Sequence, residues 1–176
     1  MADALRLKPR HGGFLRAFGC GQFIRPYLDG EGPHGSPKID PLVGAPQSDI
    51  FHHYKVSLLQ STSLDRATRE EERQARREHR AIDPAQIERL AAEFIEHLPY
   101  KSSGCRYHSF VVYFSNLKRL GWVEESGVVE PSAFQDHYPK GHPRKFYRLT
   151  AAGRAAPATA WANPRLALYG AATEKR

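Results

Sequence analysis

Apolar and polar residues follow a helical period along most of the chain after residue 50. Apolar residues between Phe51 and Leu58 recur at three- and four-residue intervals and then give way to a run of Arg and Glu, which predicts one long helix over residues 51–80. Within that run Glu72 precedes Arg76 by one turn, a spacing at which opposite charges pair. Because the run lacks sustained apolar heptads, it indicates a solvated charged helix and no coiled-coil seam.

A second amphipathic helix is predicted to begin at Asp83-Pro84. An acidic N-cap followed by proline in the first turn is typical of a helix start. The apolar residues from Ile87 to Leu98 recur at a spacing that would bury one face through three turns. Pro99 then ends the helix.

A third amphipathic helix is predicted over residues 105–120, with one apolar and one polar face. Its apolar stripe comprises Tyr107, Phe110, Val111, Phe114, Leu117 and Leu120. Gly121 follows where a left-handed C-cap would end the helix. Strand signals cover residues 122–130 and 145–150, and Thr150 is placed to cap a short closing helix.

The first 50 residues differ in composition from the rest of the chain. They hold eight of the 14 Gly and six of the 13 Pro, and both residue types disfavour helix interiors, so we predict a loop or an extended arm. The aromatic residues Phe14, Phe18, Phe23 and Tyr27 would dock this arm onto a partner or onto the chain's own domain. The whole pattern predicts a mainly α fold with a small β-hairpin, of the α+β class.

The net charge of +7 is unevenly distributed. Residues 1–100 are balanced, and the whole excess lies after residue 100, where it favours polyanionic partners. No stretch approaches the roughly 18 apolar residues that span a membrane, so we expect no membrane contact. Residues 1–10 lack the pattern of a signal peptide. We therefore expect a cytoplasmic protein in which Cys20 and Cys105 are reduced thiols.

Two segments carry a resemblance to a known family. They are Leu117-Lys-Arg-Leu120-Gly121 and Tyr147-Arg-Leu149-Thr150-Ala-Ala-Gly153-Arg154. They resemble PadR-like and MarR-like winged-helix transcription regulators, over roughly residues 84–156. The resemblance implies a winged helix-turn-helix with an extended N-terminal arm. The implied parts are an arm at 1–50, a long charged helix at 51–82, a winged-helix domain at 83–156 and a C-terminal tail at 157–176.

The resemblance also implies a role for each element in DNA binding. The helix at 105–120 would be the recognition helix in a major groove, and the loop at 131–144 would be a wing with its basic tip on phosphates or in the minor groove. The expected groove-side residues are Arg106, Tyr113, Asn116 and Arg119, with His108 and Ser109 on the same face. The expected phosphate contacts are Lys101, Ser103, Lys140, Arg144 and Lys145.

Two functions are open at this point. The first is sequence-preferring binding of double-stranded DNA, as in a transcription regulator. The alternative is a non-catalytic architectural subunit of a larger nucleoprotein or enzyme complex, in which the arm and the winged helix contact protein or RNA. A homodimer or a larger assembly is open in both cases, through residues 1–80 or the C-terminal tail.

Catalysis and metal binding have little support in the sequence. The candidate clusters are His52-His53, Cys105-x-x-His108 and His137-x4-His142. A structural zinc site takes four ligands with paired short spacings, and the sequence has no CxxC pair, nucleotide-binding loop or nucleophile elbow. We therefore expect no enzymatic activity, no cofactor and no metal.

Overall fold

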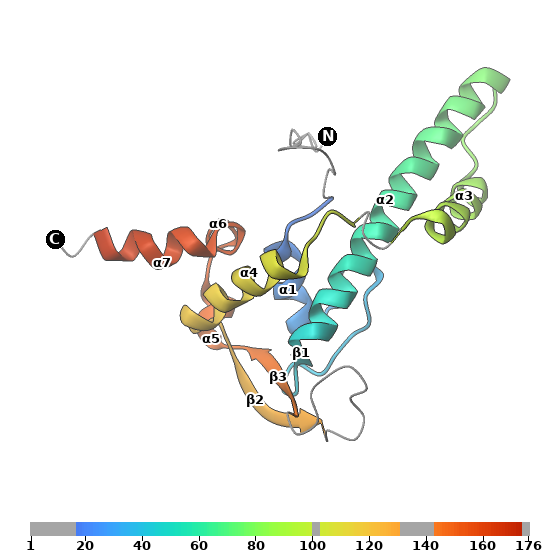
Figure 1. The fold of residues 1–176 in the computed structure, drawn as a ribbon. Helices are drawn as coiled ribbons and strands as arrows, with labels where there is room; N and C mark the ends of the chain where they lie inside the picture. The colour runs from blue at the N-terminus through green and yellow to red at the C-terminus, as the bar shows by residue number, and fades with distance from the viewer. Residues whose placement is uncertain (1–16, 100–102, 131–142, 174–176) are drawn as a thin grey trace. The chain divides into compact units, whose positions relative to one another are not determined.

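The computed structural model describes residues 17–99, 103–130 and 143–173. They form a mainly helical fold with one three-stranded antiparallel sheet (Figure 1). The expected α+β class is confirmed, and the sheet has one strand more than the predicted hairpin. Among these residues, no helix is both long and apolar enough to cross a membrane.

The described residues form two compact units. The sheet unit comprises residues 18–54 and the described residues from 106 onward, and the hairpin unit comprises residues 17, 55–99 and 103–105. Along the chain, the main part of the hairpin unit is therefore inserted between two parts of the sheet unit. This division differs from the boundaries expected from the sequence, because helix α2 (Gln47–Glu78) continues from one unit into the other.

The elements of the sheet unit follow the predicted order after residue 105. Before the insertion they are α1 (Cys20–Leu28), the 3-10 turn η1 (Pro33–Gly35), β1 (Ala45–Pro46) and the start of α2. After it they are α4 (Tyr107–Arg119), β2 (Val123–Glu130), β3 (Arg144–Leu149), α5 (Ala151–Ala155), α6 (Ala158–Ala162) and α7 (Pro164–Thr173). The predicted third helix, both hairpin strands and the closing helix are confirmed close to their expected bounds. Thr150 caps α5 as expected, since its hydroxyl accepts a hydrogen bond of 3.0 Å from the Gly153 N–H.

Helix α1 shows that the prediction of a loop or extended arm was wrong for residues 20–28, whereas residues 29–44 contain no helix or strand apart from η1. The α1 side chains Phe23, Tyr27 and Leu28 recur at helical spacing and are fully buried. The Gly and Pro content concealed this helix. Gly21 lies where α1 packs against α6, and Pro26 is accommodated inside the helix.

The core of the sheet unit is largely aromatic. The ring of Phe23 on α1 lies 5.4 Å from that of Tyr54, and the ring of Phe51 lies 5.1 Å from that of Phe110 on α4. The start of α2 therefore packs against both α1 and α4. Of the predicted docking aromatics, Phe14 lies outside the described residues and the other three belong to this core.

Strand β3 is the central strand, in the order β1-β3-β2. Tyr147 pairs with Ala45 on one side and with Glu125 on the other, both antiparallel. Gly44 stands just before β1 with a φ of 74°, and a Cβ there would lie 1.9 Å from the carbonyl oxygen of Tyr147. Glycine is therefore required for β1 to approach β3.

The hairpin unit consists of the outer part of α2 and helix α3 (Pro84–His97). As predicted, Asp83 caps α3, and its carboxylate accepts a 3.0 Å hydrogen bond from the Ala85 N–H. The buried carboxylate of Glu71 closes the turn, because it accepts hydrogen bonds from the Arg80 guanidinium and from the Asp83 N–H, the latter at 2.8 Å. These bonds, led by that of Arg80, lower the pKa of Glu71 from 4.5 to about 2.

Two expectations for the hairpin unit were wrong. The apolar face of α3, from Ile87 to Leu98, is only half-buried, and no residue of the helix is fully buried. The expected pair between Glu72 and Arg76 is not among the ion pairs of the described residues, and Arg73 pairs with Glu70 instead.

Candidate nucleic-acid interface

Helix α4 is held in the sheet unit by one apolar face. Phe110, Phe114 and Leu117 are fully buried, and Phe114 meets Tyr147 of β3 edge-on at 5.2 Å. The predicted apolar stripe was wrong at Tyr107. This residue stands at the start of the helix and remains 48% exposed. The buried face fixes which side chains of α4 point away from the core.

The opposite face of α4 is open to solvent and has no acidic residue. His108, Val112 and Arg119 recur at four- and seven-residue intervals, which places them on one side of the helix. All three are exposed, as is the neighbouring Ser109, and Asn116 is half-buried. The structure therefore brings four of the expected groove-side residues together, namely His108, Ser109, Asn116 and Arg119.

Val112 also lies on this face, although it was not among the expected groove-side residues. It is 49% exposed and lies between the polar residues. The helical period already placed it opposite Phe110 and Phe114, so its position could have been found from the sequence. An apolar side chain there can contact a thymine methyl group.

Tyr113 does not lie on the open face. Its hydroxyl donates a hydrogen bond to the carbonyl oxygen of Trp161 on α6. Burial, with the nearby Cys20 as a smaller cause, raises the pKa of the Tyr113 phenol above its usual range. The prediction of a groove contact is corrected accordingly, because this hydroxyl is used in holding α6 against α4.

Arg144 is likewise engaged within the sheet unit. Its guanidinium donates to Glu130 and Asp49, each within 2.7 Å, and to the Ser48 hydroxyl at 3.2 Å. Only 21% of the side chain is exposed. This bond network joins the start of β3 to the first turn of α2. The expected phosphate contact is therefore replaced by a structural role.

The remaining charged side chains of strands β2 and β3 are paired across the sheet. Lys145 contacts Glu125 at 2.8 Å, and Arg148 contacts Glu124 at 2.9 Å. Strands β2 and β3 thus carry three cations and three carboxylates, all in ion pairs. Lys145 is 54% exposed and can still reach a phosphate, but its pair with Glu125 reduces the local positive field.

Four expected contacts remain, namely Ser103, Lys101, Lys140 and Arg106. Ser103 is buried, with 4% exposure, so a phosphate cannot reach its hydroxyl. Lys101 and Lys140 lie outside the described residues, as does most of the expected wing loop. Arg106 is exposed at the N-terminus of α4, where it remains available to a phosphate.

In the part of the chain that the structure describes, no group of three His, Cys, Asp or Glu side chains gathers as a metal site would require. His53 accepts or donates a 2.7 Å hydrogen bond with Tyr27, and burial lowers the pKa of His53 while it raises the pKa of Tyr27 to about 12. This pair lies in the aromatic core, where it supports packing.

Comparisons with known proteins give no independent assignment. No family model, curated protein or solved structure matches this chain. The features that bear on function are therefore the geometry of α4 and the charges around it.

Proposed function

We propose that this chain is a winged-helix protein that binds duplex DNA, with α4 as the recognition helix in the major groove. The observation that carries the proposal is the open, acid-free face of α4, which is fixed by three buried apolar side chains on the other side. A helix of this kind fits the width of a major groove.

The order of elements in the sheet unit supports the same proposal. Helix α1, strand β1, the first turns of α2, helix α4 and the β2–β3 hairpin follow one another, and β1 pairs with β3. A winged helix has a short strand of this kind between its first two helices, and its hairpin forms the wing. The hairpin unit would then be an insertion between the second helix and the recognition helix.

The face of α4 offers groups for both kinds of DNA contact. Arg119 can donate two hydrogen bonds to a guanine, and Asn116 can pair with an adenine. Arg106 at the start of the helix is suited to a phosphate, and contacts to phosphates position a protein without reading sequence. Because the strands of the proposed wing are charge-balanced, we expect α4 to supply most of the phosphate contacts among the described residues of the sheet unit. Such a protein would act as a transcription regulator in the cytoplasm.

Selection of preferred duplexes from a random library tests this proposal. Competition between a selected and a scrambled duplex then gives a ratio of dissociation constants. We expect Asn116→Ala or Arg119→Gln to reduce that ratio by about 5- to 150-fold, since each good base contact contributes about 1–3 kcal/mol of discrimination. The matched control is Lys145→Gln on β3, which should leave the ratio unchanged. The proposal is refuted if no duplex is preferred, or if the α4 variants keep the preference.

The half-buried apolar face of α3 favours the architectural role as a second candidate. Half-buried apolar side chains at helical spacing are suited to a protein partner. A substitution such as Leu90→Ser would weaken an assembly and leave binding to duplex DNA intact. Sedimentation of the full chain with its co-purified partners distinguishes the two outcomes.

A further inference from the structure

The outer half of α2 carries arginines at three- and four-residue intervals that the proposed recognition helix does not involve. They are Arg66, Arg69, Arg73, Arg76 and Arg77, here called the arginine stripe. At 3.6 residues per turn this spacing places all five on one face of the helix, over a length of about 16 Å. All five are exposed, whereas the small residues Ser63, Ala67 and Ala75 are buried on another face of the same helix.

The acidic residues nearby leave most of the stripe unneutralised. Glu71 is buried against Arg80, and Glu78 also bonds to Arg80. Within the described residues, the single stripe arginine in an ion pair is Arg73, with Glu70. Asp65 and Glu72 border the stripe without pairing to it in the same part of the chain.

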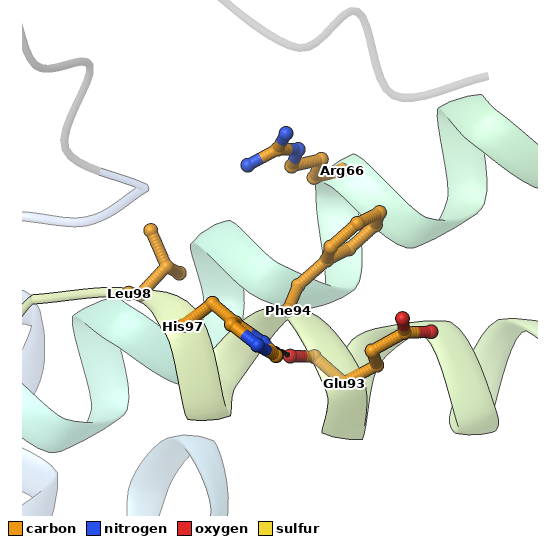
Figure 2. A pocket seen from close by; sticks show the side chains of 5 residues that line it. All are labelled: Arg66, Glu93, Phe94, His97 and Leu98. Carbon is orange, nitrogen blue, oxygen red and sulfur yellow. Dashed lines mark hydrogen bonds between the residues drawn. The ribbon is translucent and has the colours of Figure 1, made fainter.

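Two residues of the arginine stripe, Arg66 and Arg73, also have local contacts. The guanidinium of Arg66 lies 4.5 Å from the centre of the Phe94 ring and lines a pocket of about 260 Å³ with Glu93, His97 and Leu98 (Figure 2). Arg73 has its partner Glu70. Among the described residues, the side chains of Arg69, Arg76 and Arg77 are exposed and take part in no ion pair, so they are the members available to a ligand.

Helix stability alone does not account for this stripe. Cations stabilise the C-terminal turn of a helix through its dipole, which explains Arg76 and Arg77 near the end at Glu78. The effect is confined to the last turn, and Arg69 stands more than two turns from that end. A row of planar guanidinium groups is instead suited to phosphates, which Arg can bind with two hydrogen bonds.

We propose that the arginine stripe binds the phosphate backbone of duplex DNA and adds affinity that does not depend on sequence. The partner is argued from charge complementarity. The available cations Arg69, Arg76 and Arg77 span about 12 Å of one helix face, and the DNA backbone is a row of closely spaced anions. The inference rests on the proposed function in so far as DNA is the ligand. It concerns residues of the hairpin unit alone.

Salt titration of duplex binding by the full chain tests the stripe. The variant Arg69→Gln/Arg76→Gln/Arg77→Gln should bind every duplex more weakly, and the slope of log affinity against log salt should become shallower by about 2.7, at about 0.9 per lost phosphate contact. The variant Arg69→Lys/Arg76→Lys/Arg77→Lys retains the charges, so its slope of log affinity against log salt should stay close to that of the parent chain. The ratio between selected and scrambled duplexes should not change in either variant.

Arg89→Gln provides a matched control on α3 of the same unit. Arg89 is also exposed, and it contacts Gln86 instead of belonging to the stripe. It should leave the slope unchanged, and circular dichroism should show equal helicity in all variants. An unchanged slope in the triple Gln variant overturns the stripe proposal, whatever the outcome for α4.

Other results separate the two proposals. If the triple variant loses slope but no duplex is preferred by the parent chain, the stripe proposal holds and base recognition by α4 fails. If the triple variant keeps full duplex affinity but binds polyglutamate more weakly than the parent, the stripe is a surface for acidic protein and the DNA assignment is overturned.

Discussion

At the scale of single residues, internal partners determine which polar groups remain available to DNA. Tyr113 and Arg144 both have donors suited to nucleic acid, yet one donates to Trp161 and the other to Glu130 and Asp49. A sequence identifies a residue's chemistry but not its partner when that partner lies far along the chain. Asp49 is 95 positions from Arg144, so no local pattern connects them.

Replacement of Arg144 should therefore affect stability more than binding. Arg144→Gln should lower the free energy of unfolding by about 1–2 kcal/mol, because charged hydrogen bonds to Glu130 and Asp49 are lost at a site that is only partly exposed. Lys145→Gln removes one exposed pair and should cost less than about 1 kcal/mol. Urea denaturation measures both, and equal losses for the two variants would contradict the structural role of Arg144.

Glu71 gives a prediction about pH. Its pKa is lowered from 4.5 to about 2 in the folded protein, so folding favours the charged form. Its contribution to stability is present above pH 4.5 and is lost as the pH falls toward 2. In Glu71→Gln the hairpin unit should be less stable at pH 7, and its stability should depend less on pH over this interval.

Hydrogen exchange of the α2–α3 turn between pH 2 and pH 6 measures the effect, after correction for the intrinsic pH dependence of exchange. Glu70→Gln is the control, since Glu70 pairs with Arg73 on the outer surface. If Glu71→Gln and the parent chain show the same pH profile, Glu71 does not close the turn as described.

At the scale of elements, amphipathic periodicity predicted most of the structure. Helices α3 and α4, strands β2 and β3 and the cap at Thr150 follow from local patterns. Helix α1 did not, because Gly and Pro in and around it outweighed its apolar period. Strand β1 has two residues and exists through its pairing with β3, which no local pattern could indicate.

Gly44 is the most sensitive position for β1. Gly44→Ala would place a Cβ 1.9 Å from the Tyr147 carbonyl oxygen at a φ of 74°, so β1 must separate from β3. We expect a loss of at least about 1–3 kcal/mol, the typical cost of strained backbone. Gly121→Ala is a useful control, since that glycine also has positive φ but no atom near its absent Cβ. If thermal denaturation shows that Gly44→Ala and Gly121→Ala lower stability by similar amounts, the close approach of Gly44 to β3 contributes little.

At the scale of the whole molecule, the sequence shows which segments carry the excess positive charge. It does not show which of the charged side chains are taken up in ion pairs. The excess lies after residue 100, but ion pairs neutralise the β2–β3 strands. Among the described residues of that part, the exposed cations outside ion pairs lie on α4 and, as Arg165, on α7. In contrast, the charge-balanced segment before residue 100 contains the arginine stripe. Net charge by segment missed it because Glu71 and Glu78 are bound to Arg80, which lies beyond the end of α2.

The candidate interface was therefore predictable in part. The polar face of α4 follows from the helical period, and four of its expected residues do share an open surface. The insertion of the hairpin unit into the sheet unit could not be predicted, because α2 reads as one uninterrupted helix and gives no sign of a boundary at residues 54–55.

Salt-dependent binding of a selected duplex is the most direct test of the central claim that α4 contacts DNA. For Arg106→Gln/Arg119→Gln, the slope of log affinity against log salt should become shallower by up to about 1.8 where both side chains meet phosphates, and by about 0.9 where Arg119 reads a base. Preference for the selected sequence should fall in the same variant. Slope and preference equal to those of the parent chain, or a parent chain that binds no duplex even at low salt, would contradict the account.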